Sequence, residues 1–230
     1  MRSVIAIMAR APSSGGKSRL IRDLGDCDGT GLRVALLRDT LESISGLAAE
    51  KVVLYTPPDC EAEIRALTPF PAVFLPQRGT TLGDRMRDGA HDVLARGFDA
   101  MVLIGSDLPS LPPAHVTAAF NWLTRRRDAI VLGPAQDGGY YLIGLTRRHA
   151  KLFEHIPWGT PLVFTRTKEV AATFGIPVEL SPSWYDVDSA SDLRRVWQAS
   201  ESRYGVARHT RAWLTAAASA VRALVESETI

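Results

Sequence analysis

Residues 100–111, AMVLIGSDLPSL, show most clearly how this chain folds. The first five residues are all apolar, which is typical of a β-strand that is buried on both faces of a sheet. Gly105, Ser106 and Asp107 follow directly, so a carboxylate stands at the carboxyl end of this strand. Because open α/β sheets bind their ligands at that end, the stretch predicts a site beside Asp107.

On either side of this stretch, short apolar runs alternate with segments whose apolar residues recur every three or four positions. The predicted strands are residues 3–8, 51–55, 72–75, 100–104, 129–132, 140–145 and 178–180. The predicted helices are residues 32–47, 59–67, 83–96, 113–126, 161–174, 189–198 and 204–226. This alternation indicates an α/β domain with a mostly parallel central sheet and helices packed on it.

The composition narrows the class of protein. The 27 basic and 25 acidic residues leave a net charge of only +2, which argues against nucleic acid as a partner. Cys27 and Cys60 form no CxxC pair, so we expect a reducing compartment and no structural zinc. No segment has the roughly 20 apolar residues of a membrane helix. We therefore expect a cytoplasmic protein that binds neither nucleic acid nor a membrane.

We expect one main domain, because 230 residues fit a single large domain better than two small ones. The predicted boundaries are residues 1–200 for this domain and 201–230 for a helical extension. The Ala-rich extension is expected either to pack on the domain or to form the contact of a homodimer.

The loop after the first strand, RAPSSGGKSR at residues 10–19, ends like a phosphate-binding P-loop. However, Ala11 stands where the first glycine of that motif belongs, and Pro12 removes a backbone N–H from the phosphate cradle. The pattern therefore does not favour a P-loop NTPase. Lys17 and Arg19 could still bind an anionic phosphate chain, and a solvated basic loop is the alternative.

Carboxylates that could hold a divalent cation occur at two distant places. Asp107 follows the most apolar strand, and Asp186 and Asp188 alternate with Val187, so both face one side of an extended chain. Mg²⁺ and Mn²⁺ prefer oxygen ligands and often share them with substrate phosphates. The alternative is that these aspartates only stabilise a turn or cap a helix.

Two further loops carry glycines beside polar or aromatic residues. Asp137, Gly138 and Gly139 form a turn that enters the strand beginning at Tyr140, and tandem glycines let the backbone approach a ligand. A plain turn is the alternative. Trp158 could form the wall of a pocket or pack in the core.

The segment from residue 78 to residue 85 combines a helix start with two guanidinium groups. Arg78 and Gly79 precede the start, and Gly83 and Arg85 follow it. A helix N-terminus attracts anions, so a contact with a nucleotide is possible here. An exposed helix entrance is the alternative.

Taken in order, these motifs resemble the radical-SAM/selenodomain-associated bacterial transferases, which are glycosyltransferase-A-type proteins of the nucleotide-diphospho-sugar transferase superfamily. Wider relatives include 2-phospho-L-lactate guanylyltransferase and molybdopterin-guanylyltransferase-like proteins. The motifs are ARAPSSGGKSRL (9–20), LPQRGTTLGDRM (75–86), VLIGSDLPSL (102–111), VLGPAQDGGYYLIGL (131–145), IPWGTP (156–161) and DVDSASDL (186–193).

The resemblance implies a three-layer Rossmann-like fold that binds a nucleotide or nucleotide sugar, together with Mg²⁺ or Mn²⁺. It assigns Lys17 and Arg19 to the phosphates and Asp107 and Asp188 to the metal, and we add Asp186 as a third possible ligand. We place the nucleotide against Ala9, Arg10, Gly15, Gly16, Lys17, Arg78, Gly79, Gly83, Arg85 and Ser106. We place a small-molecule acceptor against Gly138, Gly139, Tyr140 and Trp158, with Asp137 as the catalytic base.

The first functional hypothesis is metal-dependent glycosyl transfer from a nucleotide sugar to a small acceptor. The alternative is nucleotidyl transfer, in which a phosphorylated acceptor attacks the α-phosphate of an NTP and pyrophosphate is released. A third possibility is a nucleotide-binding protein without turnover. The released product separates the first two, because glycosyl transfer yields a nucleoside diphosphate.

Overall fold

The computed structural model describes residues 1–146, 149, 152–202 and 205–226. Its centre is a seven-stranded sheet with the strand order β3-β2-β1-β4-β6-β5-β7. The strands are β1 (Ser3–Arg10), β2 (Glu50–Thr56), β3 (Val73–Pro76), β4 (Ala100–Gly105), β5 (Ile130–Pro134), β6 (Tyr140–Thr146) and β7 (Val178–Leu180). Strand β6 runs antiparallel to both β4 and β5, and every other pairing is parallel. The predicted mostly parallel α/β sheet is confirmed.

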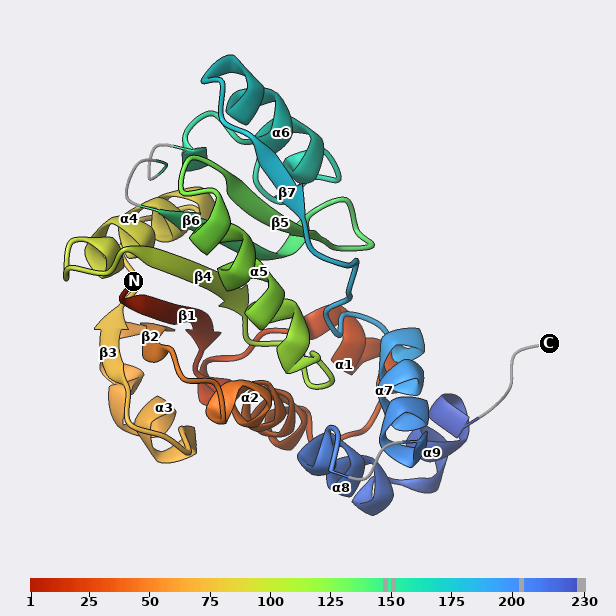
Figure 1. The fold of residues 1–230 in the computed structure, drawn as a ribbon. Coiled ribbons are helices and arrows are strands. Elements are labelled where there is room, and N and C mark those ends of the chain that lie inside the picture. The colour runs from red at the N-terminus through yellow and green to blue at the C-terminus, as the bar shows by residue number, and fades with distance from the viewer. Residues whose placement is uncertain (147–148, 150–151, 203–204, 227–230) are drawn as a thin grey trace.

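Helices cover both faces of the sheet, so the domain has three layers (Figure 1). The longer helices are α2 (Gly29–Ser45), α4 (Leu82–Leu94), α5 (Pro113–Arg125), α6 (Val163–Thr173) and α7 (Ala190–Ser202). Shorter ones are α1 (Ser18–Leu24), α3 (Glu61–Leu67), α8 (Arg208–Ala216), α9 (Ser219–Glu226), and the 3₁₀ turns Pro12–Ser14 and Pro58–Cys60. Helices α2, α3 and α5 pack on one face, and α4 and α6 pack on the other.

Side chains that alternate along each strand divide the apolar core into two clusters, one on each face of the sheet. In β1, Ile5 and Ile7 face the layer of α2, α3 and α5, while Val4 and Ala6 face the layer of α4 and α6. Successive side chains of a strand point to opposite faces, so a strand covered on both sides needs apolar residues at every position. This explains why the central strands were visible as unbroken apolar runs.

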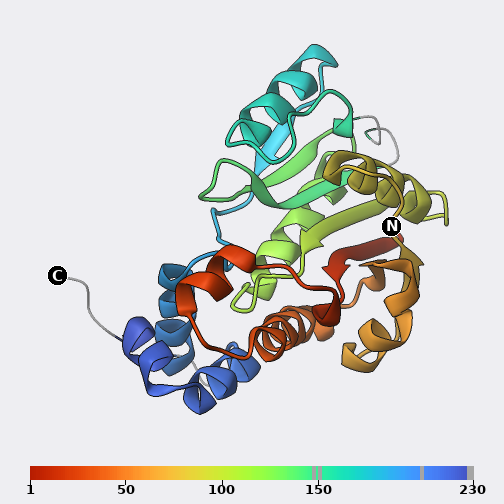
Figure 2. The same cartoon turned by 180° about the vertical axis from the view of Figure 1, so that it is seen from behind.

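A third apolar cluster lies beyond the sheet, where α1, α7, α8 and α9 gather beside α2 (Figure 2). The predicted single helix over residues 204–226 is wrong, because α8 and α9 are separate and Ala217 between them is extended. Residue 204 of that prediction lies outside the described residues. Within the described part of the chain, no helix is long and apolar enough to cross a membrane.

Candidate functional site

The loop after β1 is shaped by three consecutive residues with positive φ. Gly15, Gly16 and Lys17 have φ values of 87°, 109° and 55°, so the chain turns back and Lys17 becomes the N-cap residue of α1. Arg33 of α2 holds this loop, since its Nε donates to the carbonyl of Pro12 at 2.8 Å and its Nη1 to that of Gly16 at 3.3 Å. Sequence reasoning did not identify Arg33, because its partners lie in a separate segment.

The Lys17 side chain is only 10% exposed and lies between two carboxylates. Its Nζ is 2.9 Å from Oδ2 of Asp107 and 2.5 Å from Oδ1 of Asp188. Burial by itself lowers the pKa of Lys17, but the charges of both aspartates outweigh it and raise the pKa above the ordinary lysine value. The buried nitrogen therefore stays charged, and residues 17, 107 and 188 meet at one point.

The two acidic segments are joined through the backbone as well. The amide of Val187 donates to the carbonyl of Asp107 at 3.0 Å, and the Val187 side chain is fully buried. Burial, followed by repulsion from Asp188, raises the pKa of Asp186 to about 7. The structure therefore brings the carboxyl groups of Asp186 and Asp188 close together near Lys17, and this favours the neutral form of Asp186.

Helix capping does not account for Asp188. The residue that exchanges bonds with the first turn of α7 is Ser189: its Oγ accepts from the Asp192 amide at 3.3 Å, and Asp192 Oδ2 accepts from the Ser189 amide at 2.9 Å. This reciprocal pair is a capping box. The Asp188 carboxylate is turned instead toward Lys17.

A cavity of about 400 Å³ opens beside the loop after β1 and is called the basic cavity below. Four cationic side chains line it against two carboxylates: Arg10, Lys17, Arg19 and Arg33 against Asp107 and Asp188. The predicted nucleotide residues Gly15, Gly16 and Ser106 also line it. An excess of cations in a cavity of this size suits an anionic phosphate chain.

A second cavity, of about 600 Å³, also borders Asp107 and Asp188 and is called the aromatic cavity. Its walls include the predicted acceptor residues Gly139, Tyr140 and Trp158. Its charged residues are Arg19 and four carboxylates, Asp107, Asp137, Asp186 and Asp188. The two cavities share Arg19, Asp107 and Asp188, so they meet at the point where Lys17 is held.

The aromatic wall depends on a close approach to Gly83. A Cβ added to Gly83 would lie 2.0 Å from Nε1 of Trp158, so no larger residue fits without moving the indole. Trp158 is stacked on Phe153 and meets the edge of Tyr140, with ring centroids 6.2 Å and 6.1 Å apart. Gly83 thus gives the indole room, a role the sequence prediction of a nucleotide contact did not include.

The turn before β6 is fastened to the start of α6. The Phe164 amide donates to the carbonyl of Gly138 at 3.0 Å, and Gly138 has a φ of 87°. A Cβ at Gly138 would lie 2.2 Å from the carbonyl oxygen of Pro161. Asp137 is exposed, and one of its carboxylate oxygens accepts from the Gly139 amide at 2.9 Å.

Five of the predicted nucleotide residues do not line either cavity and have other contacts. Among the described residues that line either cavity, none is Arg78, Gly79, Gly83 or Arg85. Arg78 pairs with an aspartate of α4 at 2.6 Å, and Arg85 Nε donates to the Gly79 carbonyl at 3.1 Å. Ala9 is buried in β1, and its carbonyl accepts from a glutamine side chain at 3.2 Å. Their contacts with a nucleotide stay predictions.

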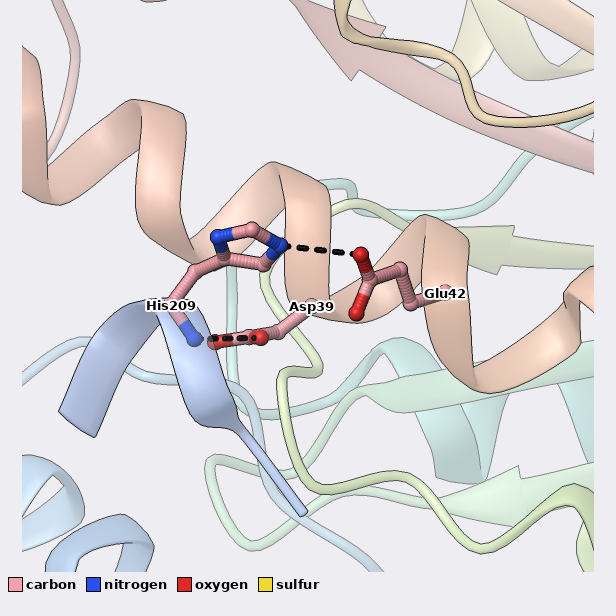
Figure 3. A group of neighbouring side chains, drawn as sticks. All are labelled: Asp39, Glu42 and His209. Atoms are coloured by element: carbon pink, nitrogen blue, oxygen red, sulfur yellow. Dashed lines mark hydrogen bonds and ion pairs between the residues drawn. The ribbon is translucent and has the colours of Figure 1, made fainter. Parts of the chain in front are cut away.

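The donor set around Lys17 fits a divalent cation. Asp107 and Asp188 already share a positively charged partner, and carboxylate oxygens are the ligands that Mg²⁺ and Mn²⁺ prefer. Among the described residues, however, the set of three side chains whose ligand atoms lie within 4.8 Å of one another is a different one: Asp39, Glu42 and His209 (Figure 3). The carboxylate oxygens of Asp107, Asp186 and Asp188 do not all lie within 4.8 Å of one another.

The Asp39 group joins the C-terminal helices to α2. Asp39 is 3% exposed, and its oxygens accept from the His209 amide at 2.9 Å, the Thr210 amide at 2.7 Å and the Thr210 hydroxyl at 2.6 Å. It therefore caps a helix 170 residues away in the sequence. Glu42 pairs with Arg208 and His209. Because these oxygens already have partners, the group is a docking contact for α8.

Similar proteins were found by sequence and by fold. A phosphoenolpyruvate guanylyltransferase of Rubrobacter xylanophilus is 31% identical over 117 residues, which are 50% of this chain and 56% of that protein. The chain therefore spans about half the length of this relative. A Desulfovibrio desulfuricans G20 protein, provisionally described as a nucleotide-diphospho-sugar transferase, has 29% identity and a TM-score of 0.80 over 97% of this chain and 96% of its own.

More distant structures share the fold. A cytidylyltransferase of Leptospira borgpetersenii has 16% identity and a TM-score of 0.59, covering 100% of this chain and 99% of its own. Glucosyl-3-phosphoglycerate synthase of Mycobacterium tuberculosis, solved with Mn²⁺ and uridine diphosphate, has 14% identity and a TM-score of 0.50 over 79% of this chain and 70% of its own.

The chain thus shares its fold and part of its sequence with transferases, whereas the radical-SAM association stays a prediction. A family model described as "Uncharacterized protein conserved in bacteria (DUF2064)" matches residues 40–160, which is more than half of the chain, and the chain belongs to that family.

Proposed function

We propose that this chain is a transferase that uses a nucleotide-activated donor together with Mg²⁺ or Mn²⁺. The observation that carries the proposal is the position of Lys17, which is buried between Asp107 and Asp188 where the basic and aromatic cavities meet. A phosphate group placed there would have the basic cavity on one side and an acceptor in the aromatic cavity on the other.

The basic cavity supplies the phosphate-binding side of the site. Arg10 and Arg19 line this cavity beside the loop after β1, and Arg33 keeps that loop in place. A bound divalent cation would supply Lewis-acid stabilisation of charge on the phosphate oxygens. Asp107 and Asp188 would hold it, and the Lys17 ammonium would transfer from these carboxylates to a phosphate oxygen.

Nucleotidyl transfer is the reaction we place first. The four cationic side chains of the basic cavity outnumber its two carboxylates, which suits the phosphate chain of either kind of donor. The relative with 31% identity is a guanylyltransferase, which supports this order. This reverses the order expected from the motifs alone, where glycosyl transfer came first.

Glycosyl transfer remains the second candidate because of the aromatic cavity. Tyr140 and Trp158 present ring surfaces there, and the apolar faces of sugar rings pack on such surfaces. Asp137 lies in the same cavity and is our candidate base for an acceptor hydroxyl in either reaction.

The released product tests the proposal. The purified protein is incubated with each NTP or nucleotide sugar and Mn²⁺, and thermal shift identifies the donor that raises its melting temperature. Pyrophosphate and nucleoside diphosphate are then assayed with candidate acceptors. Pyrophosphate supports nucleotidyl transfer, and nucleoside diphosphate supports glycosyl transfer.

Asp107→Ala is the critical variant, and Asp128→Ala, which changes an exposed aspartate outside both cavities, is its control. We expect Asp107→Ala to remove Mn²⁺-dependent turnover and Asp128→Ala to keep it. Full turnover in Asp107→Ala, or no stabilisation by any nucleotide with Mn²⁺, would show that the proposal is wrong.

A further inference from the structure

The loop that carries Asp107 is held by a single hydroxyl group from another element. Thr40 lies in the middle of α2 and is fully buried. Its Oγ1 accepts a hydrogen bond from the Leu108 amide at 2.9 Å. Its single proton is shared between two acceptors, the Ser106 carbonyl at 3.0 Å and the carbonyl of Leu36, one helical turn earlier, at 2.9 Å.

These contacts fix the chain on both sides of Asp107. Ser106 precedes it and Leu108 follows it, and the carbonyl of Asp107 itself accepts from Val187. Three consecutive residues of the loop are thus tied to α2 or to the 186–188 segment. Because the backbone around Asp107 is fixed, the Asp107 side chain can move only by rotation about its own bonds. The direction of its Cα–Cβ bond is therefore set by the contacts with Thr40 and Val187.

The hydroxyl of Thr40 is the part of the side chain that matters here. A buried amide needs a hydrogen-bond partner, and Leu108 is only 1% exposed. Valine has nearly the same shape as threonine, but it can neither accept from Leu108 nor donate to Ser106. Replacing Thr40 by valine would therefore release the loop without opening a large cavity.

We propose that Thr40 is a positioning residue that aims the Asp107 carboxylate at the cation bound beside the donor phosphates. The inference rests on the proposed function, which makes Asp107 a metal ligand. Thr40 touches neither cavity and acts through the two peptide groups that flank Asp107. Loss of a group that orients a metal ligand typically weakens metal binding 10- to 100-fold.

The test compares Thr40→Val with Thr40→Ser, which keeps the hydroxyl, and with Thr167→Val as a matched control. Thr167 is 1% exposed in the middle of α6, and its hydroxyl also donates to a carbonyl one turn earlier, that of Val163. The probe is Mn²⁺ alone, with free Mn²⁺ measured by electron paramagnetic resonance at a temperature where all variants are folded.

We expect Mn²⁺ affinity to fall about 10- to 100-fold in Thr40→Val and to stay within about threefold of the wild type in Thr40→Ser and Thr167→Val. Hydrogen exchange of the Leu108 amide should accelerate at least tenfold in Thr40→Val alone. Should Thr40→Val fail to fold, Thr40→Ala replaces it, because it removes the same hydroxyl without placing a second methyl group against the loop.

The two measurements separate the inference from the proposed function. If the wild type binds no Mn²⁺ because the Lys17 ammonium competes for the carboxylates, the same variants are compared in a Lys17→Met background. Absence of Mn²⁺ binding in Lys17→Met contradicts the proposed metal site, and Leu108 exchange then decides by itself whether Thr40 holds the loop. The inference is overturned if Leu108 exchange is unchanged in Thr40→Val. It is also overturned if the wild type binds Mn²⁺ and Thr40→Val binds it equally well.

Discussion

Replacing Asp39 by alanine should loosen the C-terminal helices from the domain. The carboxylate of Asp39 is buried and caps the first turn of α8, where the N-cap residue Ala207 offers no side-chain acceptor. The substitution leaves two backbone amides and one hydroxyl, those of residues 209 and 210, without their acceptor. The rest of the interface keeps its apolar contacts, so the loss is confined to these hydrogen bonds.

The expected cost follows from these contacts. Loss of an N-cap side chain costs about 1 kcal/mol, and each buried amide without a partner costs roughly 1–3 kcal/mol. Burial raises the pKa of Asp39, although the bonds from residues 209 and 210 lower it, so removing the carboxylate also relieves a desolvation cost. The net loss should be about 2–4 kcal/mol of unfolding free energy, and Asp39→Asn, which keeps one acceptor oxygen, should lose about half as much.

Urea unfolding at pH 7 measures this difference, with Asp128→Ala as the exposed control. The melting temperature of Asp39→Ala should fall by about 2–4 °C for each kcal/mol lost. A loss below about 0.5 kcal/mol, equal to that of the control, would mean that water satisfies the amides of α8 and that the cap stabilises nothing.

Three further predictions concern pH, Lys17 in the loop after β1, and the turn before β6. The hydrogen bond from Arg208 lowers the pKa of Glu42 to about 2, so the stability from Glu42 is complete above its ordinary value of 4.5 and is lost as the pH falls toward 2. Glu42→Gln should be less stable than wild type at pH 7, and this gap should close below pH 3 in urea titrations; a gap independent of pH would contradict the assignment. Lys17→Met should bind Mn²⁺ more tightly without nucleotide, because the competing ammonium is gone, and should lose about 10²- to 10³-fold in turnover; unchanged values of both would count against the site. Gly138→Ala should lower the unfolding free energy by at least about 2 kcal/mol in thermal unfolding, because the strain of a positive φ and a clash of the new Cβ with the Pro161 carbonyl add together. Gly159→Ala is the control: Gly159 has a similar φ, but a Cβ there meets no atom within 4 Å, so the loss should be only about 1 kcal/mol. Equal losses of unfolding free energy in the two variants would exclude the clash.

The sheet was predictable because its central strands are buried on both faces and appear as apolar runs. The direction of β6 was not, since an apolar run looks the same whether its strand is parallel or antiparallel to its neighbours. Lys17 and Asp107 could be placed near each other because the carboxyl ends of parallel strands share one edge. Asp188 was expected to share a cation with Asp107 from the alternation at residues 186–188 and from the motif resemblance, but its ion pair with Lys17 was not predicted.

The residues that support the site were not predictable. Thr40 and Asp39 are polar positions within an amphipathic helix, and such positions are usually exposed. Their partners lie far along the chain, since Thr40 bonds across 66 residues to Ser106 and Asp39 across 171 residues to Thr210. A sequence shows a buried hydroxyl or carboxylate only when its partner is a near neighbour, so both roles needed the structure.

Helix α2 serves three parts of the molecule at once. Near its N-terminal end, Arg33 donates a hydrogen bond to the loop after β1. Further along the helix, Thr40 contacts the loop that carries Asp107, and the neighbouring Asp39 accepts from the first turn of α8. A shift of α2 along its axis by one residue, about 1.5 Å, would therefore disturb the contacts of Arg33, Thr40 and Asp39 together. Insertions within α2 should therefore be inherited only with compensating changes at every attachment, and α8 and α9 should evolve under the constraint of a candidate site that none of their described residues lines.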